Sequence, residues 1–161
     1  MESINALTYL LQHTATIMHR QADQVLQERL GIGMSQFKIL TTLEERANVQ
    51  QRFLADTLGQ TEASISRQIK LLAEKGMLTV DINPKNRRQH GLALTAKGLK
   101  VVHAARDIVA EYHAPAFDKM NDKEKQQFAE SLQHLHLFYC QEGKPYACDL
   151  PWFSHYSQEV V

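Results

Sequence analysis

Three cationic side chains fall close together in this chain, at Lys85, Arg87 and Arg88. Ammonium and guanidinium groups form charge-assisted hydrogen bonds to phosphate oxygens, so phosphate is the ligand that this group suits. Pro84 cannot donate to a β-ladder, and the asparagines at positions 83 and 86 tolerate turn conformations. The run 83–89 is therefore expected to be an exposed connection, which on its position alone would also fit an ordinary solvated loop.

Short strands are expected on both sides of this run. Leu78, Val80 and Ile82 alternate with Thr79 and Asp81 before it, and the leucines at 92 and 94 keep the same alternation after it. A period of two gives each arm one apolar face, which is typical of half-buried strands. The pattern predicts a β-hairpin with the cations at its tip.

A helix-turn-helix is predicted directly upstream of the hairpin. Residues 51–58 form a short helix with one apolar side, and Gly59 is expected to end it as a C-terminal cap. Thr61 then opens a second helix that reaches residue 75. In this helix the buried stripe falls at i, i+4 and i+7, and consists of Ile65, Ile69 and Leu72.

The other faces of the second helix have side chains suited to duplex DNA. The side chains in its first turns are short, which lets the helix backbone approach a groove closely. Arg67 and Lys70 can reach base edges or phosphates. The alternative is an amphipathic helix with a polar outer face, but the hairpin that follows favours DNA. The candidate DNA-binding residues are Thr61, Glu62, Ala63, Ser64, Ser66, Arg67, Lys70, Lys85, Arg87 and Arg88.

The order of these motifs resembles the multiple antibiotic resistance regulator (MarR) family of winged-helix transcription factors. The resemblance covers roughly residues 1–142 and rests on the segments LADTLG (54–59), ASISRQIKLL (63–72), KGML (75–78), the cationic run, and LALTAKG (92–98). Family members typically carry aspartates where this chain has Asn83 and Asn86. An aspartate there can orient a wing arginine by an ion pair, so its loss either leaves the wing less firmly held or leaves the asparagine side chain to orient the arginine by hydrogen bonding.

The resemblance implies a homodimer that binds an inverted-repeat operator in double-stranded DNA, acts as a repressor, and is released by a small aromatic effector. No motif identifies the effector contacts. Met18, His19 and Phe37 are of suitable type, but each is assigned to the core or the surface.

Both ends of the chain have helical patterns. Apolar residues repeat at helical spacing in the first 25 residues, another helix is expected after Thr95, and Asn121 to Glu124 form a capping box that starts a last one. Pro115 is expected to separate or kink the last two helices. A small winged domain cannot bury all these apolar faces, so a second copy of the chain is expected to cover them, with a monomeric core as the alternative.

The predicted fold class is mainly α, a winged helix-turn-helix with a small β-hairpin wing and terminal helices that form a dimerisation domain. The expected division is a helical dimerisation region at 1–32 and 96–142, a winged DNA-binding domain at 33–95, and an aromatic tail at 143–161 that packs on the dimer.

Net charge gives no general attraction to nucleic acid, because 18 Lys and Arg balance 18 Asp and Glu. Locally the balance differs: residues 61–90 contain six Lys and Arg against three acids. No apolar run approaches the roughly 18 residues that span a bilayer, and no leader pattern is present. The protein is expected to be cytoplasmic, without a membrane partner.

Eight histidines and two cysteines raise a metal or redox hypothesis. His134 and His136 point to different sides of a helix, and only His136 and Cys140 have the i, i+4 spacing of a helical ligand pair. The sensing cysteine best known in the family lies in the first helix, where this chain has none, so Cys140 is assigned to packing and Cys148 is given no role. No metal site or cofactor is predicted.

No nucleophile elbow, phosphate loop or paired carboxylate site occurs, so an enzyme is not predicted. Two alternatives to the effector-released repressor stay open. One is a redox- or metal-responsive sensor of the same fold, and the other is a winged-helix module that binds protein or RNA.

Overall fold

The computed structural model of the chain describes residues 3–46, 48–82 and 90–139. Within these ranges it contains six helices and one two-stranded antiparallel sheet. This confirms the predicted fold class, mainly α with a small hairpin. The elements are α1 (Ile4–Leu30), α2 (Met34–Glu45), α3 (Gln51–Leu58), α4 (Glu62–Glu74), β1 (Leu78–Ile82), β2 (His90–Leu94), α5 (Ala96–Phe117) and α6 (Asp122–Tyr139).

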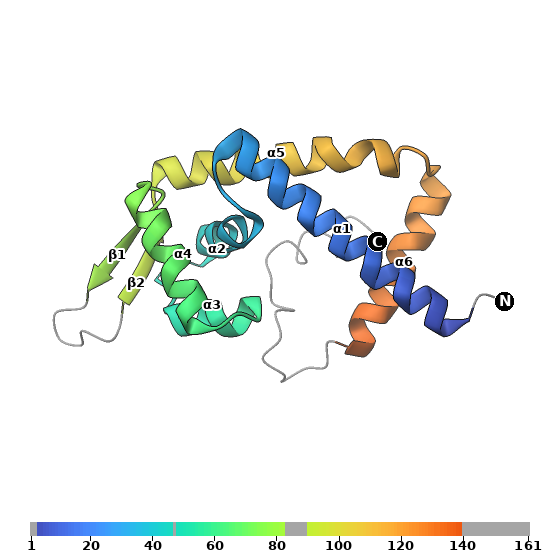
Figure 1. Cartoon of the computed structure of the whole chain (residues 1–161), viewed down its shortest axis with the longest axis horizontal. Coiled ribbons are helices and arrows are strands. Elements are labelled where there is room, and N and C mark those ends of the chain that lie inside the picture. Colours follow the sequence, from blue (N-terminus) through green and yellow to red (C-terminus); the bar gives the residue numbers. More distant parts are fainter. Residues whose placement is uncertain (1–2, 47, 83–89, 140–161) are drawn as a thin grey trace.

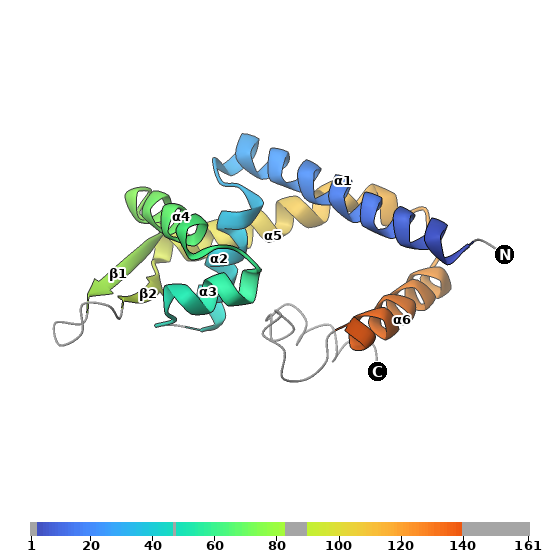
Figure 2. The same cartoon turned by 60° about the horizontal axis from the view of Figure 1, so that its bottom comes forward.

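The elements divide between two ends of the molecule. Figure 1 shows α2, α3, α4 and the hairpin gathered at one end, with α5 leading away from the hairpin and α6 folding back from the far end of α5. The helix α1 packs against α5 and α2 and extends toward that far end. Figure 2 shows that α1 and α6, which overlap in the first view, are separate segments there.

The hydrophobic core lies between α2 and the elements around it. The predicted stripe on α4 is buried, with Ile65 and Leu72 fully enclosed and Ile69 nearly so. Enclosing an aliphatic side chain of this size stabilises the fold by about 1.5–3 kcal/mol. Other elements contribute Leu26, Ile39, Leu40, Leu54, Leu92, Val102 and Ala105.

The hairpin has the predicted arms. Leu78 pairs with Leu94 and Val80 with Leu92, so these four side chains lie on one face of the sheet. Leu78 and Leu92 are buried in the core, whereas Val80 in the middle of β1 is exposed. The last pair is Ile82 with His90, and the connection 83–89 lies outside the described residues.

The predicted helix boundaries are set by side-chain caps. Thr61 accepts a hydrogen bond from Ser64 N at 3.2 Å, and Thr95 accepts one from Gly98 N at 3.0 Å. Gly59 ends α3 with φ at 62°. The capping box at the start of α6 is reciprocal: Glu124 N donates to Asn121 Oδ1, and Asn121 N donates to Glu124 Oε2.

Pro115 does not separate the last two helices, so that part of the expectation was wrong. Helix α5 continues through Pro115 to Phe117, and the break between α5 and α6 falls after that residue. Proline removes one backbone hydrogen bond and crowds the preceding turn, but only two helical residues follow Pro115 in α5. Asp118 N still bonds to Ala114 O at 2.8 Å, so the last turn remains closed.

In the part of the chain that the structure describes, no helix is both long and apolar enough to cross a bilayer.

Candidate nucleic-acid interface

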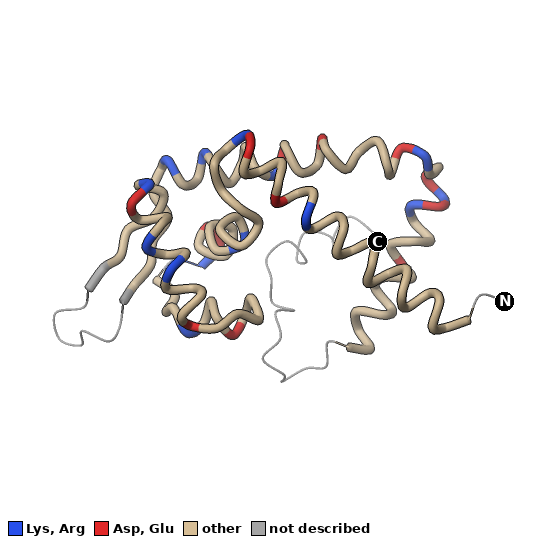
Figure 3. Tube along the Cα trace, in the orientation of Figure 1, with Lys and Arg blue, Asp and Glu red and all other residues tan. Residues whose placement is uncertain are grey.

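One side of α4 is free of the core. Thr61, Glu62, Ala63, Ser66, Arg67 and Lys70 are exposed, and we call these residues the α4 polar face. Ser64 is half-buried, so it is the one predicted residue on this helix that does not lie fully in solvent. Figure 3 shows basic positions along α4 near the hairpin end of the molecule.

The start of α4 is well defined. The Thr61 cap satisfies one of the backbone N–H groups that a helix N-terminus leaves unpaired. Glu62 in the first turn interacts favourably with the positive end of the helix dipole. A carboxylate at this place can also accept a hydrogen bond from a cytosine amino group in a major groove.

The hairpin projects from the domain beside α4 (Figures 1 and 2). Because Ile82 and His90 pair at the outer end of the strands, they fix both ends of the segment that carries Lys85, Arg87 and Arg88. These three cations themselves lie outside the described residues.

Two lysines near α4 have structural partners. Lys75 donates through Nζ to Gly31 O at the end of α1, and Lys97 donates through Nζ to Lys75 O at 2.7 Å. Both ammonium groups lie at helix C-terminal ends, where a cation is favoured by the dipole and by the unpaired carbonyls. The side chain of Lys75 is therefore engaged with the end of α1.

A charged cluster joins the end of α2 to α5. Glu44 accepts from Arg106, with Arg106 Nη1 3.3 Å from Glu44 Oε1, and His103 Nε2 lies 3.0 Å from the same oxygen. The side chain of Glu44 is only 18% exposed, so this cluster is more shielded from solvent than an ordinary surface pair. It fixes the long helix α5 to the winged domain.

Metal ligands do not gather in the described residues: no group of three His, Cys, Asp or Glu side chains is placed to hold an ion. Cys140 and Cys148 lie outside the described residues. Of the three residues considered for an effector, Phe37 is in the core, Met18 is half-buried and His19 is exposed.

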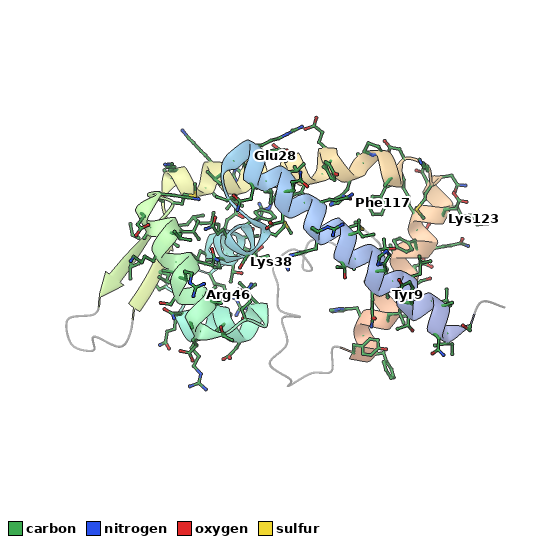
Figure 4. The ribbon with its side chains drawn as sticks, viewed as in Figure 1. Tyr9, Glu28, Lys38, Arg46, Phe117 and Lys123 are labelled. Atoms are coloured by element: carbon green, nitrogen blue, oxygen red, sulfur yellow. The ribbon has the colours of Figure 1, made fainter. Side chains whose placement is uncertain are left out.

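The far end of the molecule exposes a large amount of apolar surface. The described part of α6 has no buried residue, and Leu135 on it is 45% exposed. Figure 4 shows Tyr9 and Phe117 at this end, away from the winged domain. We call the following residues the terminal apolar surface: Ile4, Leu7, Leu10 and Leu11 on α1, Tyr112 and Phe117 on α5, and Phe128, Leu132 and Leu135 on α6.

Charge is scarce along the same elements. Residues 4–19 of α1 and 131–139 of α6 contain no Asp, Glu, Lys or Arg (Figure 3). Depletion of charge together with exposed aromatic and aliphatic side chains is the composition of an interface core.

Residues 32–90 match the MarR family model. Two relatives are similar over most of the chain. Transcriptional regulator HosA of Escherichia coli O111:H- is 19% identical over 77% of this chain and 86% of its own length. HTH-type transcriptional regulator BilQ of Clostridium symbiosum is 25% identical over 70% of this chain and 77% of its own.

Solved structures show the same fold. A MarR-family transcriptional regulator from Rhodococcus sp. RHA1 superposes with a TM-score of 0.70 at 21% identity, covering 85% of this chain and 99% of that one. CouR from Rhodococcus jostii RHA1, bound to p-coumaroyl-CoA, has a TM-score of 0.67 at 22% identity, with coverage of 85% and 96%. A variant of S. aureus MepR bound to an oligodeoxyribonucleotide has a TM-score of 0.56 at 24% identity, with coverage of 80% and 94%.

The family match falls on the winged helix-turn-helix, and the hairpin and helix caps around it follow the predicted motif order. The winged helix-turn-helix region of the chain is of the MarR-family type, and the two relatives that match over most of the chain are transcriptional regulators.

Proposed function

We propose that this regulator is a repressor that binds an inverted-repeat DNA operator as a homodimer and leaves it when a small-molecule effector binds. The observation that carries the proposal is the α4 polar face: a capped helix with its apolar stripe buried turns a row of short and basic side chains to solvent. The S. aureus MepR variant, which shares the fold, was solved with an oligodeoxyribonucleotide.

In this proposal α4 enters the major groove. Ala63 and Ser66 are small enough for the helix to approach the base edges, and Arg67 and Lys70 lie one and two turns into the helix, where base edges and phosphates are within reach. A well-placed bidentate contact to a base discriminates against the wrong base by about 1–3 kcal/mol.

The wing supplies a second contact. Arg88, together with Arg87, is proposed to enter the minor groove next to each half-site, where a narrow A·T-rich groove concentrates negative potential. Lys85 would contact phosphate. The pairing of Ile82 with His90 supports this role, because it sets the base of the segment beside α4.

The terminal apolar surface supports the homodimer. Leaving so many aliphatic and aromatic side chains in water is unfavourable, at about 25 cal/mol for each Å² of apolar surface. A second copy would cover it through α1, the end of α5 and α6, which gives the division into a dimerisation region at 1–32 and 96–142 and a DNA-binding domain at 33–95. A two-fold axis then places two α4 helices on half-sites about one turn of DNA apart, ~34 Å.

The effector is proposed to be a small aromatic compound. The proposal is supported by the resemblance to the MarR family and by CouR, a protein of the same fold that was solved with p-coumaroyl-CoA. No described residue is assigned to the effector.

Selection of bound fragments from genomic DNA, followed by fluorescence anisotropy on the enriched sequence, tests the proposal. It is supported by an enriched inverted repeat that binds two chains, and by its release when an aromatic acid is added. Equal recovery of all fragments, or a single unpaired half-site bound by one chain, would overturn it.

A further inference from the structure

The side-chain amide of Gln60, in the turn between α3 and α4, bridges two helices. Its Nε2 donates to Ser35 Oγ on α2 at 2.9 Å, and its Oε1 accepts from Ser64 Oγ on α4 at 3.2 Å. Ser35 Oγ also lies 3.1 Å from Gln60 Oε1, so this hydroxyl faces both ends of the amide. One glutamine therefore ties the first turn of α4 to the first turn of α2.

The anchor point on α2 is itself held in place. Asp23 on α1 accepts a hydrogen bond from Met34 N at 2.7 Å, which caps a helix whose N-cap residue Gly33 has no side chain to do so. A Cβ at Gly33 would lie 2.7 Å from Asp23 Oδ1, so a larger residue there would push the capping carboxylate away from its present position. A carboxylate at a helix N-terminus makes a strong, charge-assisted cap.

A second glutamine holds the same end of α4. Gln51 on α3 donates through Nε2 to the backbone carbonyl of Glu62 at 2.9 Å. The start of α4 is thus attached to α3 by Gln51 and to α2 by Gln60, whereas the rest of the helix is held by its apolar stripe. Apolar packing is non-directional, so these polar contacts are what define the rotation and tilt of the first turn.

We infer that Gln60 is a positioning residue: with Ser35 and Ser64 it sets the orientation of α4 that allows base readout. The inference rests on the proposed function, since orientation matters only if α4 binds DNA. Hydrogen bonds to base edges require accurate distances and angles, whereas attraction to phosphates acts over longer range. Loss of the amide should therefore lower specific binding and leave non-specific binding unchanged.

The test compares Gln60→Ala, Ser35→Ala, Ser35→Thr and the double variant Ser35→Ala/Gln60→Ala in the full-length protein. Gln126→Ala is the matched control, because it also loses a glutamine hydrogen bond, from Nε2 to Glu130 Oε1 at 3.0 Å, but on α6. Two quantities are measured: the affinity ratio between the selected operator and a scrambled duplex at one salt concentration, and hydrogen–deuterium exchange of the peptide that contains residues 61–66.

Gln60→Ala is expected to lower the affinity ratio about tenfold, because each of the two subunits loses the net stabilisation of a typical hydrogen bond. Ser35→Ala should lower the ratio less, Ser35→Thr should leave it unchanged because the hydroxyl is kept, and the double variant should match Gln60→Ala alone. Exchange at 61–66 should rise in Gln60→Ala and stay unchanged in Gln126→Ala.

An unchanged affinity ratio or unchanged exchange in Gln60→Ala would overturn the inference while the proposed function stands. Equal losses on operator and scrambled DNA would also overturn it, because they would show general destabilisation. If the unmodified protein has no operator preference, the proposed function fails, and the exchange comparison still decides whether Gln60 anchors α4.

Discussion

Gly98, in the first turn of α5, lies directly against the backbone carbonyl of Met77, so closely that a Cβ on residue 98 would be 2.0 Å from Met77 O. The same contact is flanked by Thr95, whose N donates to Met77 O at 3.2 Å and whose hydroxyl donates to Gly76 O at 2.8 Å. The long helix α5 therefore begins on the turn that joins α4 to the hairpin. We expect changes at this joint to affect both the fold and the α4 polar face.

Gly98→Ala should lower the free energy of unfolding by about 1–3 kcal/mol, because a backbone atom cannot move aside as a flexible side chain can. Urea denaturation followed by circular dichroism measures it. Gly31→Ala is the control, since nothing lies within 4 Å of a Cβ there and the cost is limited to its φ of 65°, about 1 kcal/mol. Equal effects at both positions would show that the contact with Met77 is unimportant.

Thr95→Val should lower stability by about 1–2 kcal/mol, because valine keeps the shape of threonine but cannot cap Gly98 N or donate to Gly76 O. Thr95→Ser retains the hydroxyl and should retain most of the stability. The prediction fails if the valine and serine variants unfold at the same urea concentration.

The Glu44 and Arg106 pair should show measurable coupling, about 1 kcal/mol at the upper end of exposed pairs, because Glu44 is mostly shielded from solvent. A double-mutant cycle with alanine at both positions measures it. Arg52 and Asp56 supply the comparison. Arg52 Nε lies 3.9 Å from Asp56 Oδ2 and both side chains are largely exposed, so their coupling should be near zero. Similar coupling in the two cycles would contradict the role assigned to burial.

Leu135→Lys on the terminal apolar surface should convert the proposed dimer to a monomer at micromolar concentration, because a charge would be buried there without a partner. Sedimentation velocity reports the change, and circular dichroism checks that the helices persist. Gln133→Lys places the same charge on a different face of α6 and should leave the dimer intact. A dimer that survives Leu135→Lys would place the subunit contact elsewhere.

Local chemistry made much of this fold predictable from the sequence. The helix starts predicted at Thr61, Thr95 and Asn121 depend on residues three positions apart, and the alternation around Leu78 and Leu92 depends on a period of two. These interactions formed as expected. The buried stripe of α4 followed from spacing alone for the same reason.

Contacts between distant segments could not be predicted in this way. The helix α2 was not singled out, because most of it is buried and its pattern is not that of an amphipathic surface helix. The need for glycine at residue 98 depends on Met77, 21 residues earlier, and the bridge from Ser35 through Gln60 to Ser64 joins three elements. The position of the break near Pro115 was misjudged, because the hydrogen bonds that keep the neighbouring turns helical cannot be predicted from the proline alone.

The same difference between local patterns and contacts of distant segments applies to the candidate site. The residues of the α4 polar face are exposed as predicted, whereas Ser64, a further predicted residue of the same helix, is half-buried. The structural use of Lys75 was missed, because its acceptor is Gly31 O at the end of a different helix. A lysine just after an amphipathic stripe gives no local signal of such a contact.

The salt dependence of operator binding tests the central claim most directly. If each subunit makes about four phosphate contacts, the dimer releases about eight counterions, and anisotropy titrations should give a log–log slope of affinity against salt near −7. Arg88→Ala should bind more weakly and reduce that slope. A slope near zero, or an Arg88→Ala protein that binds the operator as tightly as the unmodified one, would contradict the account.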